Sequence, residues 1–126
     1  MKIKSVAGIT CYIKSLNKTA DFYELLGFDI KKRDSTHLTA YSNWFWIDFI
    51  AVSKEARPQF KKEATQKKKG TALFIYLGVD DVDGFHRELV GGGLKPVSAP
   101  ADSPSGNREF ILRDPDGYNL VIFKRK

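Results

Sequence analysis

The feature that most constrains the fold is an internal repeat with a constant spacing of 66 residues. Four apolar or glycine positions of the first half recur as similar residues in the second half. The pairs are Ile13 and Val79, Leu16 and Val82, Gly27 and Gly93, and Phe28 and Leu94. A repeat of this length is typical of a duplicated supersecondary unit, which the chain must then stack or pair. The sequence therefore predicts two copies of a βαβββ module.

Periodicity and turn residues place the elements of each copy. The first copy is predicted to contain a strand at 5–14, a helix at 18–26 that stops at Gly27, and strands at 28–33, 36–42 and 44–52. The second is predicted to contain a strand at 71–79, a helix that Asp81 caps and the glycines at 91–93 end, and strands at 94–99, 108–113 and 118–124. We expect a single domain of 1–126, with module one at about 1–53 and module two at about 71–126.

The intervening segment of about 54–70 carries most of the net charge of +6. It holds seven basic and two acidic residues, shows no strand period and contains Pro58. Such a segment is typical of a solvated linker with at most a helical turn. Because the rest of the chain is nearly neutral, the charge distribution argues against a nucleic-acid partner.

Composition also bears on the cellular location of the protein. No apolar run approaches the ~18 residues that a transmembrane helix needs, and no apolar leader follows the opening Met-Lys-Ile-Lys. Cys11 is the single cysteine and cannot form an internal disulfide. We therefore expect no membrane association, no signal peptide and a cytoplasmic location.

Two motifs give the repeat a family context. Residues 22–28 contain Phe-Tyr-x-x-Leu-Gly-Phe, and residues 114–117 form an Asp-Pro-Asp-Gly turn between the strand-like runs 110–112 and 120–123. In that turn proline presets φ and glycine supplies a positive φ. Together and in this order, the motifs resemble the glyoxalase / bleomycin resistance / dioxygenase superfamily, also called the vicinal oxygen chelate superfamily. The resemblance implies an α+β fold in which the two βαβββ modules form a curved mixed-sheet cup with helices outside. It also implies a homodimer with shared sites.

Alternation along the strands sorts the side chains between the helix side and the concave side. The concave set is rich in aromatic residues with a few polar groups, the composition of a small-molecule site. The candidate ligand-binding residues are Thr10, Tyr12, His37, Tyr41, Trp44, Trp46, Asp48, Phe74, Tyr76, Arg113 and Phe123.

Metal-dependent members of the family hold a divalent cation with His and Glu on four inward positions. The resemblance places those positions at Gly8, Asp48, Phe74 and Val121. Only Asp48 can ligate, and a catalytic divalent site normally needs three protein ligands. We therefore expect no metal and no other cofactor. Metal-dependent glyoxalase, extradiol dioxygenase and fosfomycin-type transferase activities are not expected.

The leading interpretation is a metal-free protein that binds an aromatic or conjugated small molecule, neutral or anionic, as resistance members of the family sequester drugs. A first alternative is a metal-independent lyase, isomerase or dioxygenase-like enzyme that uses Asp48 or His37 as its base. A second is a structural or regulatory module whose concave face is filled by its own side chains. Asp48 is also open to a plain structural role, hydrogen-bonded to Arg113 or Tyr76.

Overall fold

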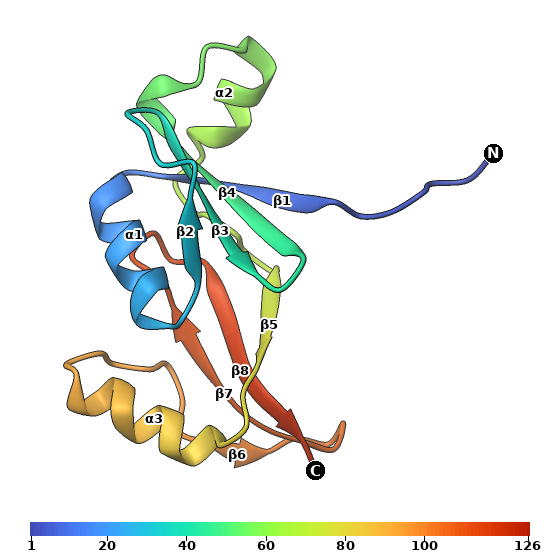
Figure 1. The fold of residues 1–126 in the computed structure, drawn as a ribbon, viewed down its shortest axis with the longest axis vertical. Coiled ribbons are helices and arrows are strands. Elements are labelled where there is room, and N and C mark those ends of the chain that lie inside the picture. The colour runs from blue at the N-terminus through green and yellow to red at the C-terminus, as the bar shows by residue number, and fades with distance from the viewer. The chain divides into compact units, whose positions relative to one another are not determined.

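The structure is a computed structural model that describes residues 1–126, and the chain divides into two compact units, residues 1–67 and 68–126. Figure 1 shows the helices and strands of each unit along the chain. The boundary lies inside the segment 54–70 that the sequence marks as a linker. No helix is both long and apolar enough to cross a membrane.

The first unit contains one mixed sheet and two α-helices. Its elements are β1 (Gly8–Ile13), α1 (Leu16–Leu25), β2 (Asp29–Lys31), β3 (His37–Ser42), β4 (Phe45–Ala51), a 3-10 turn (Val52–Lys54) and α2 (Pro58–Ala64). The strand order is β1-β4-β3-β2, with β1 parallel to β4 and the other pairs antiparallel. Helix α1 contacts β2, β3 and β4 and so covers one face of the sheet.

The second unit repeats this plan. Its elements are β5 (Phe74–Gly78), α3 (Val82–Gly91), β6 (Ala101–Asp102), β7 (Asn107–Arg113) and β8 (Asn119–Arg125). The strand order is β5-β8-β7-β6, and β5 runs parallel to β8. Each unit is therefore a βαβββ module with its own four-stranded sheet, which confirms the predicted α+β class and the duplication.

The repeat extends to the ends of the helices. Ser15 caps α1 by accepting a hydrogen bond from the backbone N–H of Lys18, and Asp81 caps α3 by accepting one from Gly84. In each unit the chain leaves the helix through a glycine at positive φ, 99° at Gly27 and 92° at Gly93. The predicted cap and both predicted glycine stops are confirmed.

Each unit has an apolar core between its sheet and its helix. In the first unit the ring of Tyr23 lies 4.6 Å from that of Phe49, and neither side chain is exposed. Phe45 and Leu73 were also predicted to pack on the helix side but are 39% and 49% exposed, whereas most of the strand residues predicted to pack there are buried in both units. They include Cys11, Ile13, Leu38, Ala40, Ile47, Phe49, Phe110, Leu112, Leu120 and Ile122.

Two of the predicted segments take a different form in the structure. Residues 94–99 do not form a strand; the segment meets β7 only where Val97 N–H donates to the Ile111 carbonyl and Ile111 N–H donates to the Ser98 hydroxyl. Pro96 and Pro100 lack N–H donors, so a longer ladder cannot form there, and the short β6 begins after them. The segment 54–70 is also more ordered than a solvated linker, since it contains α2.

The packing of the core predicts that alanine substitutions at two phenylalanines of β4 lower the free energy of unfolding by unequal amounts. Phe49→Ala removes a fully buried ring and should lower the free energy of unfolding by ~3–5 kcal/mol. Phe45 lies on the same strand and the same side of the alternation but is 39% exposed, so Phe45→Ala should cost less than about half as much. Urea unfolding of the two variants measures both values. Equal losses would contradict the assignment of the core.

Candidate functional site

The face of the first sheet opposite α1 carries three rows of predicted site residues. The rows follow from the pairing of β1 with β4 and of β3 with β4. One row is Gly8, Trp46 and Tyr41; the next is Thr10, Asp48 and Thr39; the third is Tyr12, Ile50 and His37. Tertiary structure thus brings together six predicted residues from three strands, with a polar row between two aromatic ones.

Asp48 occupies the centre of this face. Its carboxylate accepts a hydrogen bond from the hydroxyl of Thr39, a buried residue on the neighbouring strand. Thr10 is its partner in register on the other side. The carboxylate is only partly buried, so its remaining lone pairs can accept hydrogen bonds from a polar group of a ligand.

Trp46 covers the position at which metal-dependent relatives carry their first histidine. A Cβ built on Gly8 would lie 2.4 Å from Cδ2 of the Trp46 indole, well inside van der Waals contact. The indole therefore lies directly on the Gly8 backbone, and no larger side chain fits there unless the ring moves. The first ligand position of the family is filled by an aromatic surface.

The equivalent positions of the second unit are also unsuited to a metal. Phe74 pairs with Asn119, and Val121 pairs with Tyr76, in the same parallel arrangement that joins Gly8 to Trp46 and Asp48 to Thr10. No group of three or more His, Cys, Asp or Glu side chains is placed to hold a metal ion. The residues present do not fit the family's divalent cation.

His37 lies one row away from Asp48 and interacts with a different carboxylate. Its Nδ1 is 3.1 Å from the Thr36 hydroxyl and 3.4 Å from Asp34. Backbone and side-chain donors of Thr36, followed by the backbone N–H of His37, lower the pKa of Asp34 to about 2. The two candidate bases thus share a face but have separate partners, and an acid–base role for either stays a prediction.

Trp44 is the predicted site residue that lies outside a strand. It occupies the turn between β3 and β4, next to Asn43 at a positive φ of 56°, and is 91% exposed. The sequence pattern extends the strand to residue 44, but the two-residue turn takes that position. Trp44 is therefore placed at the rim of the first unit rather than among the three rows.

A cluster that the sequence analysis missed borders the third row. The Tyr12 hydroxyl donates to Glu55 Oε1 at 2.6 Å, and Arg57 Nη2 donates to the same oxygen at 2.6 Å. Glu55 is only 7% exposed, and hydrogen bonds from Arg57 and then Tyr12 lower its pKa to about 2. Burial and then Glu55 raise the pKa of Tyr12. The sequence signal that could have indicated this cluster is an acidic residue, Glu55, two positions before Arg57 inside a basic segment.

The second unit places its predicted site residues on one face as well. Phe74 and Arg113 flank Asn119 in one row, and Phe123 lies four residues further along β8 on the same side of the strand. The rings of Tyr76 and Phe123 meet edge to face with centroids 5.4 Å apart, while Arg113 donates a hydrogen bond to the Asn119 side chain at 3.1 Å. Phe74 and Tyr76 are about half exposed, which leaves an open aromatic surface.

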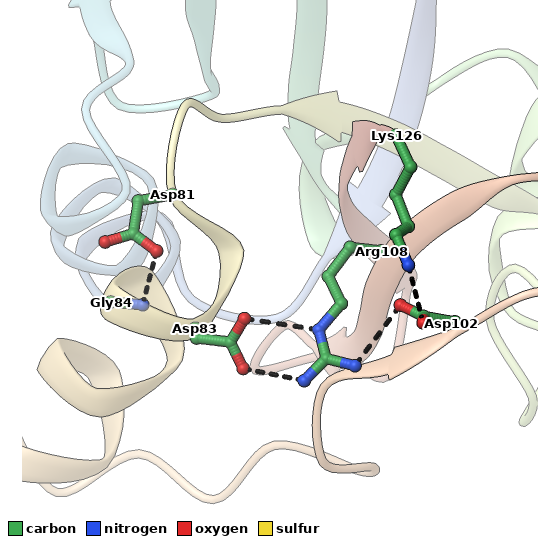
Figure 2. A network of polar contacts seen from close by, with 6 residues as sticks. All are labelled: Asp81, Asp83, Gly84, Asp102, Arg108 and Lys126. Atoms are coloured by element: carbon green, nitrogen blue, oxygen red, sulfur yellow. Dashed lines mark hydrogen bonds and ion pairs between the residues drawn. The ribbon is translucent and has the colours of Figure 1, made fainter.

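Figure 2 shows a polar network elsewhere in the second unit. Arg108 forms a two-pronged contact with Asp83, at 2.9 and 3.2 Å, and also reaches Asp102, which Lys126 contacts at 2.7 Å. These contacts lower the pKa of both carboxyls: Arg108 is the main cause at Asp83, and Lys126 at Asp102. A cavity of about 300 Å³ lies beside the network. The carboxylates of the network, Asp81, Asp83 and Asp102, already have donors, which is typical of a structural clamp between the start of α3 and the strands β6 and β7.

The comparisons with known proteins agree with this geometry. The family model of the glyoxalase/bleomycin resistance protein/dioxygenase superfamily matches residues 5–122. The chain belongs to this superfamily. No curated protein sequence matches it.

Solved structures share the fold over nearly the whole chain. A hypothetical protein from S. aureus superposes with a TM-score of 0.79 and 21% identity, covering 98% of this chain and 94% of that one. A bleomycin-binding protein complexed with bleomycin gives a TM-score of 0.65 and 25% identity, covering 98% and 100%. A bleomycin resistance determinant encoded on transposon Tn5 gives 0.66 and 25%, covering 98% and 99%.

The Trp46–Gly8 contact leads to a prediction about metal content. We expect protein purified from cells supplied with Zn, Mn, Fe and Ni to contain far less than one equivalent of any of them, because only one of four ligand positions carries a ligand. Elemental analysis measures this. About one equivalent per chain, lost in Asp48→Ala, would overturn the expectation.

The low pKa of Glu55 leads to a prediction about acid stability. The folded state depresses this pKa from 4.5 to about 2, so the stabilisation is fully present above pH 4.5 and is lost as pH falls toward 2. Wild type should therefore have a higher urea midpoint than Glu55→Gln at neutral pH, and the gap should narrow below pH 4.5. A gap that stays constant down to pH 2.5 would contradict this assignment.

Proposed function

We propose that this protein binds a small aromatic or conjugated molecule, without a metal, on the face of the first sheet that carries Trp46, Asp48 and Tyr12. The observation that carries the proposal is the Trp46 indole lying on Gly8. It puts an aromatic surface where metal-dependent relatives need a histidine. Stacking on such a surface contributes ~0.5–1.5 kcal/mol beyond area burial.

The similarity to the bleomycin-binding protein supports a role in small-molecule binding, as in sequestration or resistance. The net charge of +6 favours a neutral or anionic ligand over a cationic one. Asp48 then serves as the hydrogen-bond acceptor that orients the ligand, since Thr39 holds its carboxylate in place.

A second candidate function is metal-independent catalysis. The observation in its favour is that Asp48, partly exposed at the centre of the face, has a carboxylate positioned by Thr39 and bordered by Thr10. A positioned carboxylate can act as a general base once a substrate proton lies within hydrogen-bond reach. Loss of turnover but not of binding in Asp48→Asn would favour this function over sequestration.

We also propose a cytoplasmic homodimer. The support for the dimer is exposed apolar surface: Leu73, Phe74 and Tyr76 of the second unit are each 46–54% exposed, more than a monomer usually leaves open. The support for the compartment is the single, buried Cys11. Sedimentation equilibrium at micromolar concentration should give twice the chain mass, and a monomer there would contradict the dimer.

Tryptophan fluorescence tests the binding face directly. N-phenyl-1-naphthylamine, a neutral aromatic probe, should quench the protein's emission on binding, and Trp46→Ala should weaken its affinity about two- to tenfold. Trp44→Phe is the matched control, because Trp44 lies in the exposed β3–β4 turn. Binding that is unchanged by Trp46→Ala, or lost equally in Trp44→Phe, would show that this face is not the site.

A further inference from the structure

We propose that Arg57 is a specificity-determining residue that selects ligands with an anionic group at the Tyr12 end of the binding face. This inference rests on the proposed function and names the chemical class of the ligand, an aromatic molecule with a carboxylate, sulfonate or phosphate. It assigns a binding role to the segment 54–70, whose basic residues are otherwise unexplained.

The first step of the argument is that the Arg57 guanidinium is held in one orientation. Its Nε lies 3.1 and 3.2 Å from the two oxygens of Glu55, and its Nη2 lies 2.6 Å from Oε1. The ring of Phe60, one turn along α2, lies beneath the guanidinium at 3.6 Å. Because Glu55 holds the edge of the guanidinium and Phe60 holds its face, the Arg57 side chain loses little conformational entropy when it binds an anion.

The second step is that this guanidinium is beside the binding face. The Tyr12 hydroxyl and Arg57 Nη2 donate to the same Glu55 oxygen, each at 2.6 Å. Tyr12 belongs to the third row of the face, two positions along β1 from Thr10. Glu55 thus ties the arginine to the edge of the aromatic surface through a single carboxylate.

The third step is that the arginine keeps donors for a ligand. A guanidinium has five N–H donors; Glu55 accepts from Nε and Nη2, and the Tyr12 hydroxyl also interacts with the Arg57 side chain, so these partners do not use all five donors. The Arg57 side chain is 56% exposed, so solvent and ligands can reach it. Charge-assisted hydrogen bonds to an oxyanion are stronger than bonds between neutral groups.

The fourth step concerns local charge. Glu55 and Glu63 carry the negative charges of this short stretch, but the exposed Lys54, Lys61 and Lys62 outnumber them once Arg57 is added. The surroundings of Arg57 are therefore basic, which favours an anion over a neutral group. If the Glu55–Arg57 pair only tethered α2, the protein would not distinguish an anionic ligand from a neutral one through Arg57.

The experiment uses two probes with the same ring system. 1-Anilinonaphthalene-8-sulfonate carries a sulfonate, and N-phenyl-1-naphthylamine lacks it. Arg57→Gln should weaken the sulfonate probe at least about fivefold and the neutral probe less than twofold. Arg57→Lys, which keeps the charge but loses the fork, should give an intermediate loss. Lys61→Gln is the matched control, because it removes one charge from the same helix, and it should change neither probe more than twofold.

Equal effects of Arg57→Gln on both probes, no effect on the sulfonate probe, or the same loss in Lys61→Gln would each overturn the inference. A double variant, Glu55→Gln with Arg57→Gln, removes both charges without leaving Glu55 unpaired and should show the same selective loss. If it binds the sulfonate probe like wild type, the inference is wrong. Trp46→Ala separates the two proposals. If this variant binds both probes as tightly as wild type, the proposed function fails. If it binds both probes more weakly and Arg57→Gln is not selective, only the role of Arg57 fails.

Discussion

The parallel pairing of β1 with β4 is the constraint on which the candidate site depends. These strands lie far apart in sequence, and their register sets Gly8 beside Trp46, Thr10 beside Asp48 and Tyr12 beside Ile50. A shift of one residue would exchange the aromatic face for the apolar side that packs on α1. The buried Ile13, Ile47 and Phe49 exclude that shift, because it would expose them to water. The core therefore determines which side chains the face presents.

Gly8 occupies a position at which metal-dependent relatives of the superfamily carry a ligand, and the Trp46 indole lies over it. The missing side chain at Gly8 leaves room for the Trp46 indole to lie on the backbone, and each residue accounts for the other. The duplicated unit keeps the same geometry with Phe74 and Val121 in place of ligands. Gly8, Phe74 and Val121 therefore offer no metal ligand, and aromatic rings lie at two of these three positions, which supports the proposed recognition by stacking.

Sequence reasoning reached most of the fold but less of the site. Helix caps and glycine stops are local signals, so Asp81, Gly27 and Gly93 could be assigned from the chain alone. The strand predicted at 94–99 failed because alternation counted apolar residues and ignored the missing donors of Pro96 and Pro100. The cluster of Glu55 and Arg57 was missed because its partner, Tyr12, lies more than forty residues earlier, and a long-range hydrogen bond leaves no local pattern.

The sequence by itself determined the duplicated βαβββ plan, the side of most strands that enters the core and the residue types at the positions where the family places its ligands. These depend on periodicity, on turn chemistry and on which residue types are present. Only the tertiary structure decided that Trp46 lies on Gly8, that Thr39 holds Asp48, that Trp44 stands in an exposed turn and that Arg57 is fixed beside Tyr12. Apart from the Trp44 turn, each of these facts joins residues from different elements, and strand register and side-chain packing bring such residues together only when the chain is folded.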